Sequence, residues 1–304
     1  MTFNIQEQVN WEPEIKGGEV GDFDNVVVGG MGGSALPARA LFYLDPTYPI
    51  WLHNDYGFPE KVAGEPLFVA ISYSGNTTET LSFANEVLSK GRKLAVITSG
   101  GKLLELARAN NLPFVEVPVG LQPRDSVVYM LKGLLTLVQK RDILDELAAV
   151  NLAEIEANSN LQSSEIANAL ADTIAIVYTS RENAVLGYIW KILLNETAKM
   201  PAFCNCFPEL THNEMQGLVN QSAVRILLVE DVADNEGVKN EMEVFGHVSL
   251  NNGLKVSEYS LAGSRVSKLL QTLVTARDVA HKIAMIKGVE ADEVPFIQEF
   301  KKEL

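Results

Sequence analysis

The chain has 304 residues, of which 47% are hydrophobic and 21% are charged. This balance supports a large buried core, and the length is typical of about two domains. The formal net charge of −14 disfavours nucleic acid and anionic membrane surfaces as partners. The sequence has neither an apolar run that approaches the roughly 20 residues needed to span a bilayer nor the basic start of a signal peptide. We therefore expect a cytoplasmic protein in which Cys204 and Cys206 are reduced thiols.

In the first half of the chain, apolar strands alternate with helical patterns. Residues 1–24 are polar and are expected to form a leading arm. Strands are expected at 25–30, 50–53, 67–71, 93–98 and 114–117, and helices at 36–43, 77–90, 102–109 and 125–140. This alternation predicts a parallel sheet that is covered by helices on both faces.

The second half repeats this organisation. Residues 142–160 are acidic and rich in Asn, which predicts an interdomain helix or linker. Strands are then expected at 173–178, 225–230 and 254–259, and helices at 183–200, 238–245 and 264–287. The sequence thus predicts an α/β protein made of two halves of similar size.

The most informative segment is a loop of small hydroxyl residues within 71–80 (ISYSGNTTET), which follows a buried strand and opens a helix. Such a loop gathers hydroxyl donors and backbone N–H groups at the positive end of a helix dipole. It contains neither Lys nor Arg. This pattern is typical of a site that holds a phosphate monoester by hydrogen bonds.

A glycine-rich loop follows the strand at 25–30 and reads VGGMGGSA over residues 28–35. It fits the G-x-G-x-x-A pattern of dinucleotide-binding folds, which leaves a nicotinamide dehydrogenase as an alternative. The hydroxyl loop has no role in that alternative. Because neighbouring strand ends of a parallel sheet face one crevice, the two loops can instead share a single phosphate.

These two loops, together with 97–101 (ITSGG), resemble the sugar isomerase (SIS) fold. The segments 122–124 (QPR), 195–196 (NE) and 208–214 (PELTHNE) are similar to those of bifunctional phosphoglucose/phosphomannose isomerases. This resemblance covers nearly the whole chain. It implies two SIS domains, 1–145 with the phosphate-binding loops and 146–304 with the catalytic Glu and His and a C-terminal helix. Each would be a flavodoxin-like αβα sandwich, with the active site in the cleft between the domains and at a homodimer interface.

The resemblance also implies roles for individual residues. Glu196 would be the base, with Glu209 and Glu214 as rival carboxylates, and His212 would open the sugar ring from across the dimer interface. Arg124 would hold the enediolate oxygens, and Lys301, rather than Lys302, would be the ring-opening lysine of the last helix. The implied phosphate contacts are Gly32, Gly33, Ser34, Ser72, Ser74 and Thr77.

The implied activity is that of an intramolecular oxidoreductase of carbohydrate metabolism. It would interconvert glucose 6-phosphate and fructose 6-phosphate through a cis-enediol(ate), with neither a metal nor an organic cofactor. Mannose 6-phosphate is left open as a substrate, because residues 293–296 (EVPF) lack the small hydroxyl residue that related enzymes carry there. Two further alternatives are a non-catalytic SIS protein that senses a sugar phosphate and an isomerase domain of the glucosamine-6-phosphate synthase type.

Overall fold

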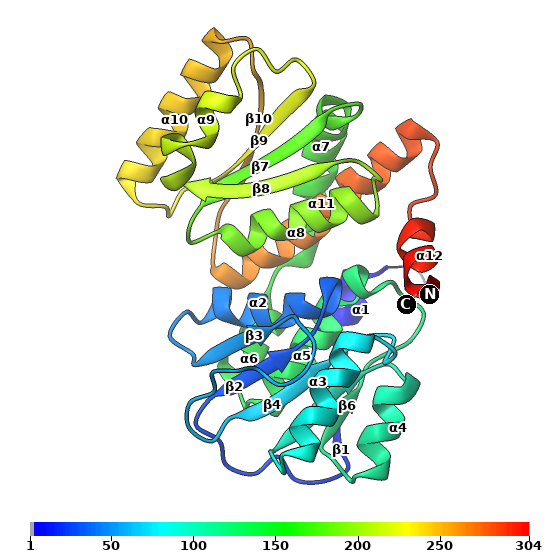
Figure 1. Ribbon diagram of the computed structural model, residues 1–304. Helices are drawn as coiled ribbons and strands as arrows, with labels where there is room; N and C mark the ends of the chain where they lie inside the picture. The colour runs from blue at the N-terminus through cyan, green and yellow to red at the C-terminus, as the bar shows by residue number, and fades with distance from the viewer. Residues whose placement is uncertain (1–2, 304) are drawn as a thin grey trace. The chain divides into compact units, whose positions relative to one another are not determined.

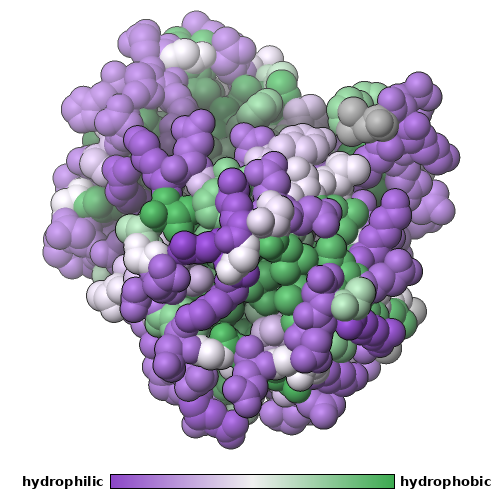
Figure 2. All heavy atoms as spheres, turned by 60° about the horizontal axis from the view of Figure 1, so that its bottom comes forward, coloured by the Kyte–Doolittle hydropathy of each residue, from purple (hydrophilic) through white to green (hydrophobic). Residues whose placement is uncertain are grey.

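The computed structural model describes residues 3–303 of the protein. The chain divides into two compact units, Met1–Val150 and Asn151–Leu304, and each contains a sheet flanked by helices (Figure 1). Hydrophilic side chains cover most of the face shown in Figure 2, in keeping with the net charge of −14. Within residues 3–303, no helix combines the length and apolar character that crossing a membrane requires.

The sheet of the first unit has the strand order β1-β6-β5-β4-β2-β3. Its strands are β1 (Ile15–Lys16), β2 (Val26–Gly29), β3 (Ile50–His53), β4 (Leu67–Ile71), β5 (Leu94–Thr98) and β6 (Phe114–Glu116). Strands β2 to β6 are parallel, and only the short β1 pairs antiparallel, with β6. The parallel strands follow the order 2-1-3-4-5 of flavodoxin-like sheets, in which the chain reverses direction across the sheet where β2 meets β4.

Helices cover both faces of this sheet (Figure 1). On one face α3 (Thr78–Ser89) and α4 (Gly101–Ala109) bury a cluster that includes Val27, Phe68 and Phe83. On the other face α2 (Leu36–Leu44) packs against α5 (Val127–Leu137), which also contacts α6 (Arg141–Ala149). Every strand and helix expected from residue 25 to residue 140 is present. Strand alternation is a dependable signal here because both faces of each central strand are buried.

The expectation of a simple leading arm at residues 1–24 is wrong. This segment contains the helix α1 (Ile5–Asn10), which packs on α5, and the edge strand β1. The side chain of Gln8 is buried and its Nε2 donates to the carbonyl oxygen of Asp125, 2.7 Å away. The segment therefore supports the 3₁₀ turn η2 (Pro123–Asp125). A helix of six residues carries too little periodicity to be recognised from sequence.

The second unit has a four-stranded parallel sheet in the order β10-β9-β7-β8. Its strands are β7 (Ile174–Ser180), β8 (Ala202–Phe207), β9 (Val224–Asp231) and β10 (Lys255–Leu261). The helices α7 (Leu152–Leu170), α8 (Ala184–Glu196) and α11 (Arg265–Lys287) pack on one another. The helix α10 (Glu236–Asn251) supplies Phe245 to a cluster with Tyr178 and Phe207. The unit also contains η3 (Glu209–His212), α9 (Glu214–Gly217) and α12 (Pro295–Glu303).

One feature of this unit differs from the expectation. Strand β8 was not predicted, because it is an edge strand whose residues Phe203 to Cys206 are partly or fully exposed and therefore lack an apolar run. Residues 142–160 form the helices α6 and α7, so the interpretation as a helix is confirmed, and the two non-helical residues between them, Val150 and Asn151, lie at the boundary of the two units. Both cysteines are free, as expected.

Candidate active site

The first part of the candidate site lies at the carboxyl ends of β2 and β4, which are neighbours in the sheet of the first unit. Open parallel sheets bind ligands at such a reversal of strand order. The glycine loop leaves β2 through the 3₁₀ turn η1 (Gly32–Ala35), and the hydroxyl loop leaves β4 toward α3. Topology therefore brings together the two loops that the sequence singles out.

The two glycines of the glycine loop have different surroundings: one has open space beside it, and the other packs closely against the backbone of a neighbouring turn. Gly32 has φ +51°, and among residues 3–303 no heavy atom lies within 4 Å of the position that a Cβ would take. A Cβ on Gly33, by contrast, would stand 2.7 Å from the backbone N of Arg124. Gly33 is thus required for η2 to pack against η1, and this packing places Arg124 beside the loop. Arg124 itself is only 2% exposed.

The hydroxyl loop is held by its own side chains. Ser72 Oγ accepts a hydrogen bond from the N–H of Gly75 at 3.1 Å and lies 2.9 Å from Thr77 Oγ1. The backbone N–H of Tyr73 donates to Ser34 Oγ at 3.0 Å, which joins this loop to the glycine loop. Ser34 and Ser72 are buried, whereas Ser74 is exposed. The loop therefore offers Ser74 outward while Ser34 and Ser72 maintain its shape.

The N-terminus of α3 is left open to a ligand. Thr77 occupies the N-cap position, but its side chain accepts no hydrogen bond from the helix backbone. The first N–H groups of an α-helix have no partner within the helix, and they carry the positive end of its dipole. The helix start thus faces the loops with unsatisfied donors, an arrangement suited to an anion.

Tyr73 is a residue of this site that sequence reasoning missed. It is buried, and its hydroxyl donates to the carbonyl oxygen of Pro118 at 2.8 Å and accepts from the N–H of Leu121 at 3.0 Å. Burial raises the pKa of Tyr73. The side chain clamps the segment that leads into η2 and Arg124. The available signal was its position between Ser72 and Ser74, inside the loop itself.

In the second unit, Glu196 is the last residue of α8 and is partly buried. It borders a mainly apolar cavity of about 480 Å³, which is also lined by Val289, Glu293, Pro295 and Phe296. A lysine side chain donates hydrogen bonds to backbone carbonyl groups at the turn that follows Glu196. Lys199 Nζ donates to the carbonyl oxygens of Glu196 and of Ala291, the latter at 3.0 Å. Cations are favourable at the C-terminus of a helix because they face the negative end of its dipole.

His212 lies far from Glu196 within this unit. The side chain of Asn195 donates to the carbonyl oxygen of Ala202, which places the end of α8 at the start of β8. His212 is exposed and ends η3, beyond the other end of β8. Strand β8 has six residues and therefore spans about 20 Å. Within one chain, the structure does not bring these two residues together.

The remaining predicted residues of the second unit are exposed or engaged elsewhere. Lys301 is exposed on α12, about 6 Å along the helix from Ile297 at the cavity wall. Glu214 accepts a hydrogen bond from the hydroxyl of Tyr178 at 3.0 Å, and burial together with this carboxylate raises the pKa of Tyr178. Glu209 accepts from Asn213 at 3.1 Å. Asn205 of β8 also donates to Glu214, so both Glu209 and Glu214 have local structural partners.

Comparisons with known proteins cover both units. Residues 159–304 match the model of the bacterial phospho-glucose isomerase C-terminal SIS domain. A curated bifunctional phosphoglucose/phosphomannose isomerase of Thermoplasma acidophilum is 30% identical over an alignment of 304 positions, which covers 99% of this chain and 95% of that protein. The enzyme of the same name from Aquifex aeolicus is 33% identical, over 98% of this chain and 95% of its own.

Solved structures show a similar fold. The hypothetical protein TT0462 of Thermus thermophilus aligns with a TM-score of 0.70 and 18% identity, over 92% of this chain and 82% of that one. At this identity the likeness concerns the fold alone. The full-length similarity to the curated enzymes goes further, and it shows that the chain belongs to the bifunctional phosphoglucose/phosphomannose isomerase family.

Proposed function

We propose that the protein is an aldose–ketose isomerase that interconverts glucose 6-phosphate and mannose 6-phosphate with fructose 6-phosphate. The observation that carries this proposal is its family membership, which extends over 99% of the chain. We further propose that the two compact units are two SIS domains and that the enzyme is a cytoplasmic homodimer. The names of the relatives do not favour the alternative of a non-catalytic sugar-phosphate sensor.

The phosphate is assigned to the loops of the first unit. The exposed backbone of Gly32, the hydroxyl of Ser74 and the uncapped start of α3 at Thr77 offer hydrogen-bond donors to an anion. Ser34 and Ser72 hold the loops in shape through their bonds to Tyr73 and Gly75. Local donors are needed because the net charge of −14 repels a sugar phosphate at long range.

Proton transfer is assigned to Glu196. Its carboxylate would take the proton from C2 of the open-chain aldose, which leaves a cis-enediolate, and return a proton to C1 to complete the ketose. Its position at the border of the apolar cavity gives this carboxylate a partly buried place in which to meet the substrate. Arg124 would stabilise the enediolate oxygens with a charge that persists throughout the reaction. Lys301 and His212 would assist ring opening, a step for which an imidazole can both accept and donate a proton.

The separation of Glu196 from His212 supports a shared active site. Since Glu196 lies near the start of β8 and His212 follows its end in one chain, we infer that the two side chains do not contact the same hexose from one subunit. We therefore assign the ring-opening imidazole of each site to His212 of the partner subunit. This arrangement would make each site incomplete in a monomer.

The role of Glu196 is tested by Glu196→Gln, with Glu293→Gln as a control that alters another carboxylate at the same cavity. Glu196→Gln should lower turnover of fructose 6-phosphate about 10³-fold or more, because the base is lost. It should retain binding of the sugar phosphate, whereas Glu293→Gln should stay within about threefold of the wild type. Proton NMR in D₂O, which follows deuterium entering C1 and C2, gives the readout. Substantial turnover by Glu196→Gln would refute its role.

The shared site is tested by mixing two inactive variants, Glu196→Gln and His212→Ala, and allowing subunits to exchange. A hybrid dimer would contain one site with both Glu196 and His212 intact. Random exchange should then restore about a quarter of the wild-type activity. Restoration of activity would support the interface site, and a mixture that stays inactive after verified exchange would contradict it.

A further inference from the structure

The backbone of Tyr73 lies where three loops of the first unit meet. Its N–H donates to Ser34 Oγ of the glycine loop at 3.0 Å. Its carbonyl oxygen accepts from the N–H of Ser99 at 3.0 Å and from Ser99 Oγ at 2.6 Å, just beyond β5. Its neighbours Ser72 and Ser74 belong to the hydroxyl loop. A displacement of the hydroxyl loop on anion binding therefore moves the backbone of Tyr73 as well.

The side chain of Tyr73 reaches a fourth segment of the chain. Its hydroxyl donates to the carbonyl oxygen of Pro118 at 2.8 Å and accepts from the N–H of Leu121 at 3.0 Å. Between these partners Val119 is 63% exposed, so the segment runs over the surface. Tyr73 itself is only 6% exposed. Because a packed tyrosine side chain has few rotatable bonds, it carries a displacement of its backbone to its hydroxyl.

Arg124 lies between two attachments of the segment that carries it. Before it, the N–H of Leu121 is bound to the hydroxyl of Tyr73. After it, the carbonyl oxygen of Asp125 accepts a hydrogen bond from Gln8 Nε2 at 2.7 Å. One attachment is thus to α1, and the other is to the hydroxyl loop. The position of Arg124 depends on that loop through the side chain of Tyr73.

We propose that Tyr73 is a positioning residue that couples phosphate binding in the two loops to the placement of Arg124. The inference rests on the proposed function, in which the loops hold the phosphate and Arg124 stabilises the enediolate. In a hexose 6-phosphate the phosphate is on C6, whereas the proton moves between C2 and C1. The enzyme must therefore keep its two binding groups at a fixed separation, and the hydroxyl of Tyr73 ties one to the other. Loss of this hydroxyl should misplace Arg124 while the loops still hold the phosphate, which lowers turnover rather than affinity.

The kinetic test is Tyr73→Phe, with Tyr259→Phe as a matched control. Tyr259 is also buried, and its hydroxyl donates to Thr275 Oγ1 at 3.2 Å in the second unit. Both variants should lower the midpoint of urea denaturation, because each leaves a hydrogen-bond partner unpaired. Only Tyr73→Phe should lower kcat for fructose 6-phosphate, by about tenfold, with the Michaelis constant changed by less than about twofold. An unchanged kcat in Tyr73→Phe, or an equal loss in Tyr259→Phe, would overturn the proposal.

A double-mutant cycle with Arg124→Gln shows whether Tyr73 acts through Arg124. Arg124→Gln alone should lower kcat about 10²-fold or more, because the positive charge beside the enediolate is lost. Adding Tyr73→Phe should lower kcat by less than about a further twofold, since no guanidinium remains to be misplaced. A further loss of about tenfold would show that the two residues act independently, and it would overturn the proposal.

Amide hydrogen exchange measures the coupling without catalysis. The probe is inorganic phosphate, which can occupy the loops but lacks the sugar carbons on which Arg124 would act. In the wild type, saturating phosphate should slow exchange in peptides that cover residues 119–126 by about threefold or more. The effect should be lost in Tyr73→Phe and kept in Tyr259→Phe. Equal protection of 119–126 in the wild type and in Tyr73→Phe would contradict the coupling. A wild type without isomerase activity would refute the proposed function, and the exchange result would still decide the coupling.

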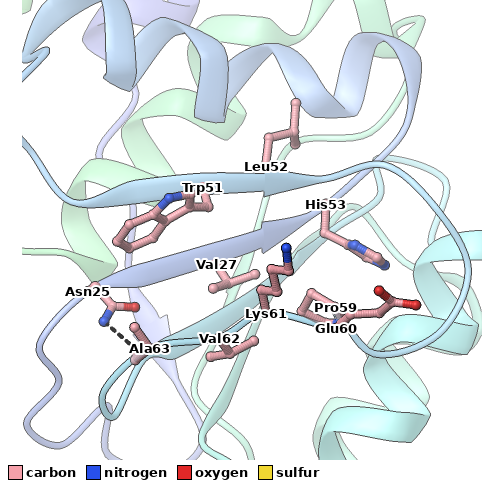
Figure 3. A pocket seen from close by; sticks show the side chains of 10 residues that line it. All are labelled: Asn25, Val27, Trp51, Leu52, His53, Pro59, Glu60, Lys61, Val62 and Ala63. Carbon is pink, nitrogen blue, oxygen red and sulfur yellow. Dashed lines mark hydrogen bonds between the residues drawn. The ribbon is translucent and has the colours of Figure 1, made fainter.

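Lys61→Gln is the control for the place at which phosphate acts. Lys61 lines a separate cavity of about 500 Å³ beside β3, together with Trp51, His53 and Glu60 (Figure 3). Within residues 3–303, no residue of the glycine loop or the hydroxyl loop lines this cavity. The effect of phosphate on residues 119–126 should therefore be unchanged in Lys61→Gln. Loss of the effect in this variant would place the phosphate beside β3 and overturn the proposal.

Discussion

The carboxyl ends of the strands in the first sheet can be compared with those in the second. This is possible because the parallel strands of the two sheets follow corresponding orders. Strands β2 and β4 of the first unit correspond to β7 and β9 of the second. In the first unit the loops at this point are uncharged, and they present hydroxyl groups and open N–H groups. In the second unit the same point is occupied by charged side chains of the protein itself.

A buried ion pair stands at that point in the second unit. Lys268 Nζ lies 2.6 Å from Asp231 Oδ2, and the side chains are each 6% exposed. Asn183 Nδ2 donates to Asp231 and to Asp234, at 3.1 Å in each case. The second unit thus fills the position where the first leaves donors for an anion. Strand order alone therefore does not make a phosphate site, since the side chains at the strand ends decide whether donors remain free.

The largest effect is expected from Lys268→Met, which breaks the buried pair. Asp231 would remain as an uncompensated buried carboxylate, so unfolding free energy should fall by about 3–5 kcal/mol. Urea denaturation at neutral pH measures this loss. The double variant Asp231→Asn with Lys268→Met should recover much of it, because neither charge remains. Equal losses in the single and double variants would show that packing, rather than charge, is responsible.

The next effect is expected from Gly33→Ala in the first unit. The added Cβ would stand 2.7 Å from the backbone N of Arg124, so η1 and η2 must move apart. This overpacking should cost about 1–3 kcal/mol of stability. The Michaelis constant for fructose 6-phosphate should also rise, by roughly tenfold or more, because donors in the loop are displaced. Kinetics and urea denaturation test both effects.

Gly246→Ala in α10 is the matched control for that change. Among residues 3–303, no heavy atom lies within 4 Å of the position of its Cβ. Ala in a helix interior should therefore raise stability by about 0.5–1 kcal/mol and leave the Michaelis constant unchanged. Similar kinetic losses in both glycine variants would mean that the loop has no special role.

A smaller effect, an increase in stability rather than a loss, is expected from Asp234→Asn, next to the buried pair of Lys268 and Asp231. Burial raises the pKa of Asp234, and the negative charge of Asp231 adds to this. The folded state therefore holds the Asp234 proton more tightly than the unfolded state, and the stability this provides at low pH is lost as pH rises through the folded pKa. Asp234→Asn carries no charge to bury, so it should be more stable than the wild type at neutral pH. The advantage should vanish below the ordinary pKa of 3.8.

Asp231 should show the reverse pH dependence. Burial alone would raise its pKa, but hydrogen bonds from Lys268, the N–H of Ala233 and Asn183 outweigh burial and lower it. Its contribution is present above the ordinary value of 3.8 and is lost as pH falls through the lower folded pKa. Urea denaturation from pH 3 to pH 8 should therefore separate the two aspartates. Parallel pH profiles for Asp231→Asn and Asp234→Asn would contradict this assignment.

The smallest change in stability is expected from Thr77→Ala, which tests whether this helix cap serves a ligand. Thr77 makes no capping bond to α3, so its loss should cost under about 1 kcal/mol but raise the Michaelis constant for fructose 6-phosphate about fivefold. Ser264, by contrast, caps α11 by accepting from the N–H of Ser267 at 3.2 Å. Ser264→Ala should lower stability by about 1 kcal/mol with unchanged kinetics. An unchanged Michaelis constant in Thr77→Ala would remove it from the phosphate site.

Several parts of the fold could be predicted because their signals are local. The buried strands β2 and β4 and the loops that follow them are contiguous in sequence, so their residue types indicate both the elements and an anion site. Strand β8 could not be predicted, since an edge strand with exposed residues has no apolar run to mark it. The hydrogen bond from Gln8 to Asp125 could not be predicted either, because two residues so distant in the chain leave no periodic pattern in the sequence.

By itself, the sequence determined the α/β class, the places of the hydroxyl and glycine loops and the family resemblance, because each depends on residues that are neighbours along the chain. Only the tertiary structure decided that Tyr73 and Ser34 join the two loops through a hydrogen bond. It also decided that Gly33 leaves room for the backbone of Arg124. Within one chain, Glu196 and His212 lie toward different ends of β8. The tertiary structure also decided that the corresponding edge of the second sheet is filled by Lys268 and Asp231. Those outcomes depend on which strands lie side by side and on which polar side chains remain without hydrogen-bond partners after packing. Neither can be derived from one contiguous segment, because the residues that decide it are distant in the sequence.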